Sequence, residues 1–145
     1  MLLGRFGDTS GCPYIEGRLI LPRLNIRGDI SFLADTGADQ TLIHPLDGLR
    51  IGIDYSTLSD TSESVGIGGI SQNFVEPALV VFSEPRRMLY IYTIVVAIAP
   101  PSPDIMNLPS LLGRDILKQW RMVVEPHRDI CTFTVRTADV RVPLR

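Results

Sequence analysis

Cysteine, histidine and clustered positive charge are scarce in this sequence, and each scarcity argues against a class of protein. The 145 residues include two cysteines and two histidines, and the formal net charge is −2. Cys12 and Cys131 lie far apart, in neither a CxxC nor a metal-ligand spacing, which argues against a zinc site and a disulfide-rich secreted scaffold. The charge offers no general attraction to nucleic acid or membranes. We therefore expect no metal, no cofactor, no nucleic acid partner and no membrane partner.

Long apolar runs are also missing. The longest, Met88 to Ala99, is shorter than the roughly 20 residues that a membrane-spanning helix needs, and it contains Tyr and Thr. The segment Met1 to Pro13 lacks the apolar core of a signal peptide. These features predict a soluble, cytoplasmic protein. The hydrophobic fraction of 45% and the charged fraction of 21% are typical of a globular domain.

Short apolar stretches separated by turn residues dominate the sequence. The pattern predicts a turn at Arg27 to Asp29, a loop with fragments of strand from His44 to Ser64, and a hairpin whose glycine-rich tip is Val65 to Ile70. Arg114 to Trp120 has the length and composition of a short helix. Strands are expected at residues 14–21, 24–33, 40–43, 71–75, 78–82, 88–99, 121–125 and 130–135. We therefore expect an all-β, barrel-like domain of about eight strands with one short helix near the C-terminus.

Acidic residues interrupt this pattern between Ser31 and Ile43. An apolar stretch ends in Asp35-Thr36-Gly37, and Asp39 follows before the chain becomes apolar again. An Asp at the end of a strand, beside a glycine that permits a sharp turn, is held rigidly and still reaches a cleft. The same residue types also form ordinary turns, and Asp39 could cap a helix. The tripeptide alone leaves both interpretations open.

The other catalytic residue types are poorly placed for hydrolysis. His44 precedes a proline, His127 falls in an expected turn, and the sequence has no HExxH motif, so a zinc hydrolase and a serine triad both lack their parts. We expect both histidines to be surface or structural residues. If the site is catalytic, carboxylate side chains must catalyse the hydrolysis.

A single carboxylate cannot both deprotonate a water and protonate the carbonyl oxygen of an amide. Two carboxylates about 3 Å apart can, because their repulsion leaves one protonated and one ionised. The sequence contains one Asp-Thr-Gly. A carboxylate mechanism therefore requires a homodimer that brings together two copies of Asp35.

Three landmarks in a fixed order favour this mechanism. They are Asp35-Thr36-Gly37 after an apolar strand, the glycine-rich hairpin tip, and Leu111-Leu112-Gly113-Arg114-Asp115 before a helix. In this arrangement the sequence resembles the retropepsin-like aspartic proteases, the family of the retroviral proteases and their bacterial and archaeal relatives. The resemblance implies a closed acid-protease barrel that forms one half of a two-fold dimer. It implies a single domain over residues 1–145, with a core at about 14–135 and extensions at 1–13 and 136–145.

The resemblance also implies roles for individual residues. Asp35, Thr36 and Gly37 would form the catalytic triplet, in which Asp35 activates water and Thr36 hydrogen-bonds to its copy across the dimer. Leu112, Gly113 and Arg114 would support the catalytic loop, with Arg114 paired to Asp39. The residues implied to bind substrate, including those of a mobile flap, are Asp39, Gly66, Ile67, Gly68, Gly69 and Leu111.

The sequence departs from the family pattern in three places. Val65 replaces a flap glycine, the segment between Ile43 and Val65 is longer, and the chain continues beyond the last matched strand. Ala38 stands where pepsin-like enzymes carry a hydroxyl that stabilises the ionised carboxylate, and the absence of that hydroxyl predicts activity reaching toward weakly acidic or near-neutral pH. We expect terminal strands to form the dimer interface, and a dimer held only around the Asp35 loops is the alternative.

Two functions are consistent with these observations. The first is an aspartic endopeptidase that cleaves extended peptide or protein substrates as a homodimer. The second keeps the fold but is a catalytically weak or inactive module for peptide binding or dimerisation, because a fold alone does not guarantee activity.

Overall fold

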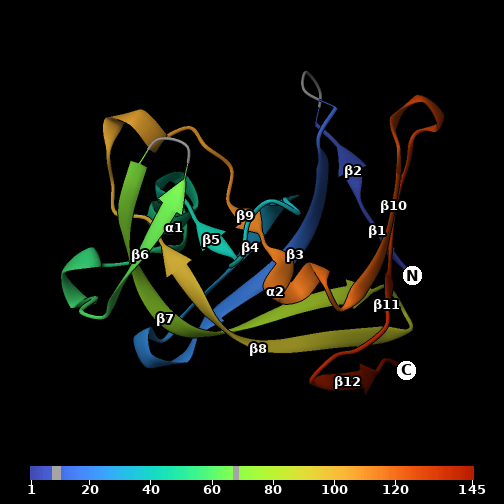
Figure 1. Cartoon of the computed structure of the whole chain (residues 1–145). Helices are drawn as coiled ribbons and strands as arrows, with labels where there is room; N and C mark the ends of the chain where they lie inside the picture. Colours follow the sequence, from blue (N-terminus) through green and yellow to red (C-terminus); the bar gives the residue numbers. More distant parts are fainter. Residues whose placement is uncertain (8–10, 67–68) are drawn as a thin grey trace.

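Antiparallel strands make up most of the structure, a computed structural model that describes residues 1–7, 11–66 and 69–145 (Figure 1). Its strands are β1 (Leu2–Leu3), β2 (Arg5–Phe6), β3 (Pro13–Leu21), β4 (Ile26–Ala34), β5 (Leu42–Ile43), β6 (Thr61–Gly66), β7 (Gly69–Glu84), β8 (Met88–Ile98), β9 (Leu111–Leu112), β10 (Trp120–Glu125), β11 (Ile130–Val135) and β12 (Val140–Pro143). Its α-helices are α1 (Pro45–Ile51) and α2 (Arg114–Leu117). Short 3-10 helices lie at η1 (Pro22–Leu24), η2 (Tyr55–Thr57), η3 (Pro103–Ile105) and η4 (Pro126–Arg128).

The larger sheet closes on itself. Its strand order is β12-β8-β5-β9-β4-β3-β7-β6, and β7 also pairs with β8, so that β7, β8, β5, β9, β4 and β3 form a ring. Most neighbours are antiparallel, but β9 runs parallel to β4 and β5 runs parallel to β8. The all-β barrel expected from the sequence is therefore present, with one short helix, α2, near the C-terminus as predicted.

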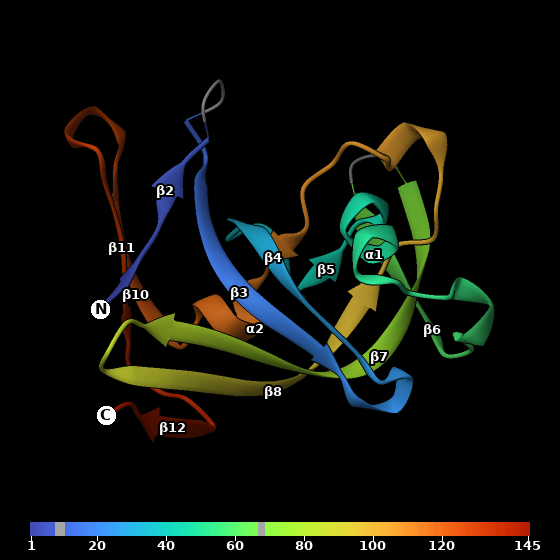
Figure 2. The same ribbon diagram turned by 180° about the vertical axis from the view of Figure 1, so that it is seen from behind.

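A smaller sheet of order β1-β11-β10 lies at one end of the barrel. Both views of the ribbon place it opposite α1 and the β6–β7 hairpin, and the two chain termini lie at this same end (Figures 1 and 2). The predicted hairpin of residues 121–125 and 130–135 is confirmed as β10 and β11, joined through η4. The C-terminal residues add β12, which pairs with β8.

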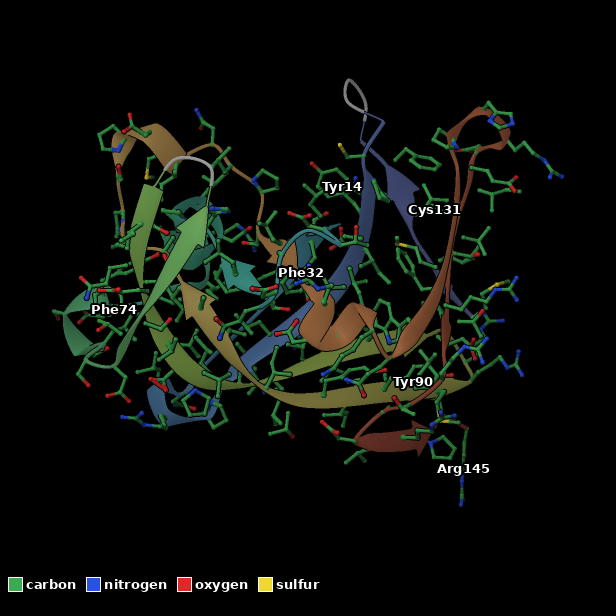
Figure 3. All side chains as sticks on the ribbon, viewed as in Figure 1. Tyr14, Phe32, Phe74, Tyr90, Cys131 and Arg145 are labelled. Carbon is green, nitrogen blue, oxygen red and sulfur yellow. The ribbon has the colours of Figure 1, made fainter. Side chains whose placement is uncertain are left out.

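Aromatic side chains join the barrel to the smaller sheet. Trp120 at the start of β10 contacts Phe82 edge to face, with ring centroids 4.8 Å apart, and its indole N–H donates to the hydroxyl of Tyr92 at 2.7 Å. Trp120 also contacts Phe133 of β11, with centroids 5.3 Å apart. Such ring pairs stabilise a core beyond the area they bury. Figure 3 labels Phe32 inside the barrel and Cys131 on the smaller sheet. The two sheets share one hydrophobic core.

Two expectations about local structure were wrong. Residues Arg27 to Asp29 do not form a turn but lie inside β4, and the chain reverses at η1, where Asn25 adopts the left-handed conformation with φ of 53°. The expected loop after His44 instead begins with the helix α1. The strands predicted at 71–75 and 78–82 are parts of the single long strand β7.

No helix among the described residues is both long enough and apolar enough to cross a membrane.

Candidate active site

Asp35 follows the last residue of β4 and is held by backbone hydrogen bonds. Its N–H donates to the carbonyl of Leu112 at 3.0 Å, and its carbonyl accepts from the N–H of Ala38 at 3.1 Å. Its carboxylate Oδ1 accepts the N–H of Gly37 at 2.9 Å. The Asp35 side chain is half-buried, whereas Thr36 and Gly37 are exposed. A tight turn thus presents one carboxylate, with one oxygen already hydrogen-bonded, at the end of a barrel strand.

Strand β9 and the start of α2 pass directly beneath this turn. Leu111 and Leu112 pair with Leu33 and Ala34 of β4. Gly113 follows and is buried, and a Cβ atom there would lie 2.5 Å from the backbone carbon of Gln40. Only glycine permits this close approach of two backbones. The backbone N–H of Arg114 then donates to the carbonyl of Ala38 at 2.8 Å.

The guanidinium of Arg114 contacts both sides of the turn. It donates to the carbonyl oxygen of Thr36 at 2.7 Å and forms an ion pair with the carboxylate of Asp39. The Arg114 side chain is 47% exposed and that of Asp39 is 89% exposed. The expected Arg114–Asp39 pair is present in the chain, and it links α2 to the turn that carries Asp35.

A cleft of about 590 Å³ opens beside Asp35. The predicted site residues that line it are Asp35, Gly37, Asp39 and Leu111. Thr36, Leu112, Gly113 and Arg114 do not line it and lie around or beneath the turn. The cleft is also lined by Ala38 and by residues that sequence reasoning did not identify: Gln40, Leu42, Glu63, Asn73 and Ala97. These come from the turn and from β5, β6, β7 and β8, which only the closed barrel brings together.

The β6–β7 hairpin forms one wall of the cleft, through Glu63 and Asn73. Its strands pair in register from Thr61 opposite Phe74 to Gly66 opposite Gly69. The hairpin that the sequence predicted is therefore present up to the pair Gly66 and Gly69. Ile67 and Gly68, the remaining predicted substrate-binding residues, lie outside the described residues.

The histidine that borders this region has a structural role, as expected. His44 is 7% exposed, its ring Nδ1 lies 2.6 Å from the carbonyl oxygen of Pro109, and its backbone N–H donates to the hydroxyl of Ser110. Within residues 1–7, 11–66 and 69–145, no group of three or more His, Cys, Asp or Glu side chains could hold a metal ion.

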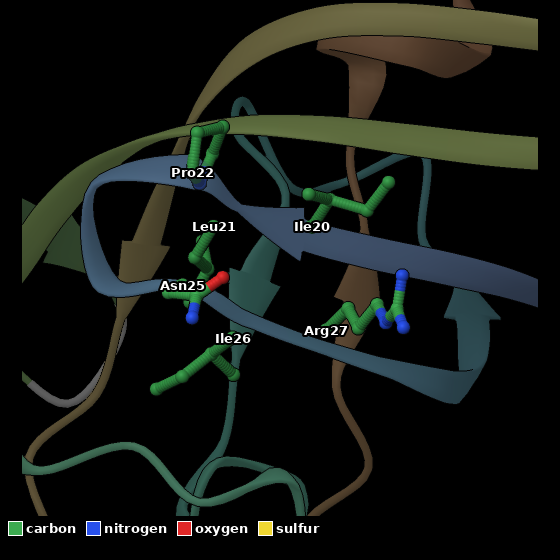
Figure 4. Close-up of a pocket in the computed structure, with 6 residues that line it drawn as sticks. All are labelled: Ile20, Leu21, Pro22, Asn25, Ile26 and Arg27. Carbon is green, nitrogen blue, oxygen red and sulfur yellow. The ribbon is translucent and has the colours of Figure 1, made fainter.

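A second cavity, of about 380 Å³, lies at the β3–β4 turn and is drawn in Figure 4. Its lining includes Pro22, Asn25 and Arg27 but no carboxylate and none of the predicted site residues. The cleft beside Asp35 is the candidate active site because four of the predicted site residues line it.

Fold and site together define a β-barrel with one aspartate at a strand-end turn beneath a hairpin. Comparison with known proteins identifies the class. The model of the family described as retroviral aspartyl protease matches residues 15–125, and the chain belongs to this family. A search of curated proteins by sequence finds no match.

Two solved structures show the same fold. A retropepsin-like aspartic protease from Rickettsia conorii aligns with a TM-score of 0.61 and 19% identity over 99% of this chain and 92% of its own. EIAV protease in complex with the inhibitor HBY-793 aligns with a TM-score of 0.50 and 17% identity over 77% of this chain and 90% of its own. The expected resemblance to retropepsin-like proteases is confirmed for the family and the fold.

Proposed function

We propose that this protein is an aspartic endopeptidase that hydrolyses peptide bonds in extended polypeptides and is active as a homodimer. The observation that carries the proposal is the position of Asp35. Its carboxylate follows a barrel strand, accepts the N–H of Gly37 and lines the cleft of about 590 Å³. The family to which the chain belongs supports the same chemistry.

The chemistry needs two copies of Asp35. In the dimer, the ionised carboxylate removes a proton from a bound water as its oxygen attacks the peptide carbonyl carbon. The protonated carboxylate of the second copy donates to the carbonyl oxygen. The resulting gem-diol then breaks its C–N bond. The first Asp35, now protonated, passes its proton to the leaving nitrogen, and one diol hydroxyl gives its proton to the ionised second Asp35 as the carbonyl of the product acid forms. Thr36 is exposed beside Asp35, and we propose that it hydrogen-bonds to its copy across the dimer.

The substrate would lie in the cleft as an added strand. A peptide between the β6–β7 hairpin and the floor of the cleft can satisfy its backbone groups as β-augmentation does. We propose that Asp39 and the hairpin tip, with Gly66, Ile67, Gly68 and Gly69, bind the substrate backbone. Leu111, half-buried in the cleft floor, would contact an apolar substrate side chain.

The test compares wild type, Asp35→Asn and a matched control on a mixed peptide library, with sedimentation of the same samples. Asp29→Asn is the control because Asp29 lies on β4, the strand that leads to Asp35, is 66% exposed and pairs with Arg18 away from the cleft. We expect cleavage by wild type and Asp29→Asn. We expect Asp35→Asn to reduce cleavage by about a thousandfold or more, because it removes the acid and base groups together.

Cleavage that persists in Asp35→Asn would contradict the proposal. A folded wild-type dimer that cuts nothing from acid to neutral pH would instead favour the second function considered, an inactive module that binds peptides in the same cleft.

A further inference from the structure

Strand β7 changes its partner at the base of the β6–β7 hairpin. Up to Phe74 its partner on one edge is β6, and from Leu79 onward the partner on that edge is β3. The other edge of β7 pairs with β8 on both sides of this change. Among the described residues, residues 76–78 of β7 therefore have no strand paired to them on the first edge. We call residues 76–78 the hinge segment.

Few backbone hydrogen bonds hold the hinge segment on this edge. The N–H of Val75 donates to the carbonyl of Asp60 at 2.9 Å, which closes the base of the hairpin. Pro77, within the hinge segment, has no N–H to donate. Pairing with β8 is then the backbone support that continues through the segment. Side-chain contacts on the other edge can therefore influence how the hairpin is oriented relative to the barrel.

A buried carboxylate lies in the hinge segment. Glu76 is 3% exposed, and it continues the row of buried side chains that Ala78, Val80 and Phe82 form along β7. Its Oε2 atom is buried and has no hydrogen-bond partner among the described residues. Burial of an ionised carboxylate costs free energy unless a cation lies close to it. An apolar side chain would suit this row better, so the carboxylate indicates a role other than packing.

The cation is Arg23 of η1, in the turn that joins β3 to β4. Its Nη1 atom lies 3.6 Å from Oε2 of Glu76 and 4.0 Å from Oδ2 of Asp60, the residue that directly precedes β6. The side chains of Arg23 and Asp60 are 58% and 68% exposed. Figures 1 and 2 show the β3–β4 turn beside β7, below the base of the hairpin. One guanidinium therefore connects a turn of the barrel to both strands of the hairpin.

We propose that the ion pair between Arg23 and Glu76 positions the β6–β7 hairpin at the wall of the cleft. The pair spans the edge on which the hinge segment has no paired strand. The part of the hairpin that lines the cleft, Glu63 and Asn73, lies directly beyond the hinge segment. Arg23 and Glu76 do not line the cleft, so they are positioning residues. The inference rests on the proposed function, in which the substrate lies between the hairpin and the floor of the cleft.

Loss of the ion pair should weaken substrate binding more than it slows the chemical step. A hairpin that adopts several orientations must be ordered when a peptide binds, and this loss of entropy reduces affinity. The Asp35 turn is supported by β9 and α2 rather than by the hairpin. We therefore expect KM for a peptide substrate to rise about threefold or more, while kcat stays within about twofold of wild type.

Three variants separate this role from a contribution to stability alone. Glu76→Met removes the charge at similar volume and should leave the fold at least as stable as wild type, because an apolar side chain then fills the buried site. Arg23→Met leaves the charge of Glu76 buried and unpaired and should lower the melting temperature. The double variant removes both charges and should recover stability. All three variants should show the raised KM, because none of them keeps the ion pair.

The matched control is Asp60→Asn. Asp60 is exposed and lies farther from Arg23 than Glu76 does, so the loss of its charge should leave KM at the wild-type value. Hydrogen exchange of the free protein gives a second readout, which needs no cleavage. In Glu76→Met and the double variant, amides of β6 and of β7 before the hinge segment should exchange faster, while those of β3 and β4 keep their wild-type rates.

The outcomes separate the positioning role from the activity. If wild type cleaves peptides and KM is unchanged in Glu76→Met and the double variant, the inference is overturned and the proposed function stands. A double variant that recovers the wild-type KM together with its stability, or exchange that accelerates equally in β3, β4 and the hairpin, would show that the pair only stabilises the fold and would overturn the inference.

A wild-type protein that folds but cleaves nothing would overturn the proposed function. Calorimetric titration with the same peptides then takes the place of KM. Weaker peptide binding by Glu76→Met than by wild type would still support the positioning role, whereas equal binding, or no binding by either protein, would overturn it as well.

Discussion

The carboxylate of Asp115 accepts two hydrogen bonds from Thr41, one from its backbone N–H at 2.9 Å and one from its hydroxyl at 2.8 Å. The Thr41 hydroxyl in turn accepts the N–H of Gly113 at 3.2 Å. Thr41 is fully buried, and it directly precedes β5, the strand that follows the Asp35 turn. This network joins α2 to the chain on the far side of the Asp35 turn.

Removing the Asp115 carboxylate should therefore destabilise the fold. Asp115→Ala leaves a buried N–H and a buried hydroxyl without their acceptor, and we expect the free energy of unfolding to fall by about 2 to 4 kcal/mol. Asp115→Asn keeps one acceptor oxygen and should lose less. Urea unfolding measures the free energy of unfolding of both variants. An equal decrease for Asp115→Ala and Asp115→Asn would contradict the proposal that the two hydrogen bonds from Thr41 stabilise the fold.

Arg114 should matter more for assembly than for stability of the single chain. Its ion pair with Asp39 is solvent-exposed, so Arg114→Ala should change the free energy of unfolding by about 1 kcal/mol or less. The same change frees the Thr36 carbonyl and loosens the Asp35 turn, and we expect weaker dimerisation and slower peptide cleavage.

The control for Arg114→Ala is Arg18→Ala, because Arg18 forms a comparable exposed pair with Asp29, 3.0 Å away, outside the cleft. Sedimentation at micromolar concentration together with peptide cleavage should separate the two variants. The expectation fails if Arg114→Ala sediments and cleaves as Arg18→Ala does.

Local sequence signals predicted the strands well but wrongly predicted a turn at Gly28. Gly28, within the expected turn, lies inside β4, where a Cβ atom would come within 2.4 Å of Ile51 on α1. This glycine allows the strand and the helix to approach each other closely. The approach depends on residues that are distant in the sequence, so the neighbouring residues alone do not distinguish such a glycine from one in a turn. Gly48 likewise lies within α1, where its missing side chain leaves room for Tyr55.

The helix α1 did carry signals at its ends. Pro45 occupies the first helical position, and Gly52 follows the helix with φ of 94°, the residues preferred at these two places. A helix of seven residues with an internal glycine has weak intrinsic propensity, so its packing on β4 determines the structure. These end signals could have predicted it.

The residues of the candidate site were likewise predicted only in part. Asp35, Gly37, Asp39 and Leu111 were identified because they belong to motifs, and they do line one cleft. Glu63, Asn73 and Ala97 line it too, but they come from three strands with no motif. Their proximity follows from closure of the barrel, a long-range property that residue spacing does not express. The sequence indicated the turn that presents Asp35 to the cleft but not the residues of the surrounding strands that line it.

Two tyrosines with buried hydroxyl groups should respond oppositely to loss of those groups. Among the described residues, the hydroxyl of Tyr55 is buried and has no hydrogen-bond partner, whereas that of Tyr92 accepts from Trp120 and donates to the carbonyl of Thr137 at 2.7 Å. Tyr55→Phe should raise the free energy of unfolding by up to about 1 kcal/mol, and Tyr92→Phe should lower it by about 1 to 3 kcal/mol. Parallel urea titrations of the two variants test this, and equal shifts would refute it.

Alkaline conditions should weaken the fold through a buried thiol. Cys131 is 5% exposed, and burial raises the pKa of its thiol above the ordinary value of 9.0. Burial likewise raises the pKa of Tyr92, although the hydrogen bond from Trp120 partly opposes this. As the pH rises through the ordinary pKa values of these groups, the unfolded chain releases protons that the folded chain retains. The folded chain then binds more protons than the unfolded chain, so the free energy of unfolding decreases as the pH rises.

The contribution of Cys131 is fully present below pH 9.0 and is lost above it, as the unfolded chain's thiol ionises. We expect the free energy of unfolding to decline from about pH 8 to pH 10, with a shallower decline in Cys131→Ala even though that variant starts from a lower stability. Cys12→Ala, a change at a half-buried position before β3, is the control and should keep the wild-type slope. Urea unfolding at a series of pH values measures the slopes. Parallel curves for wild type and Cys131→Ala would show that the buried thiol is not the group responsible.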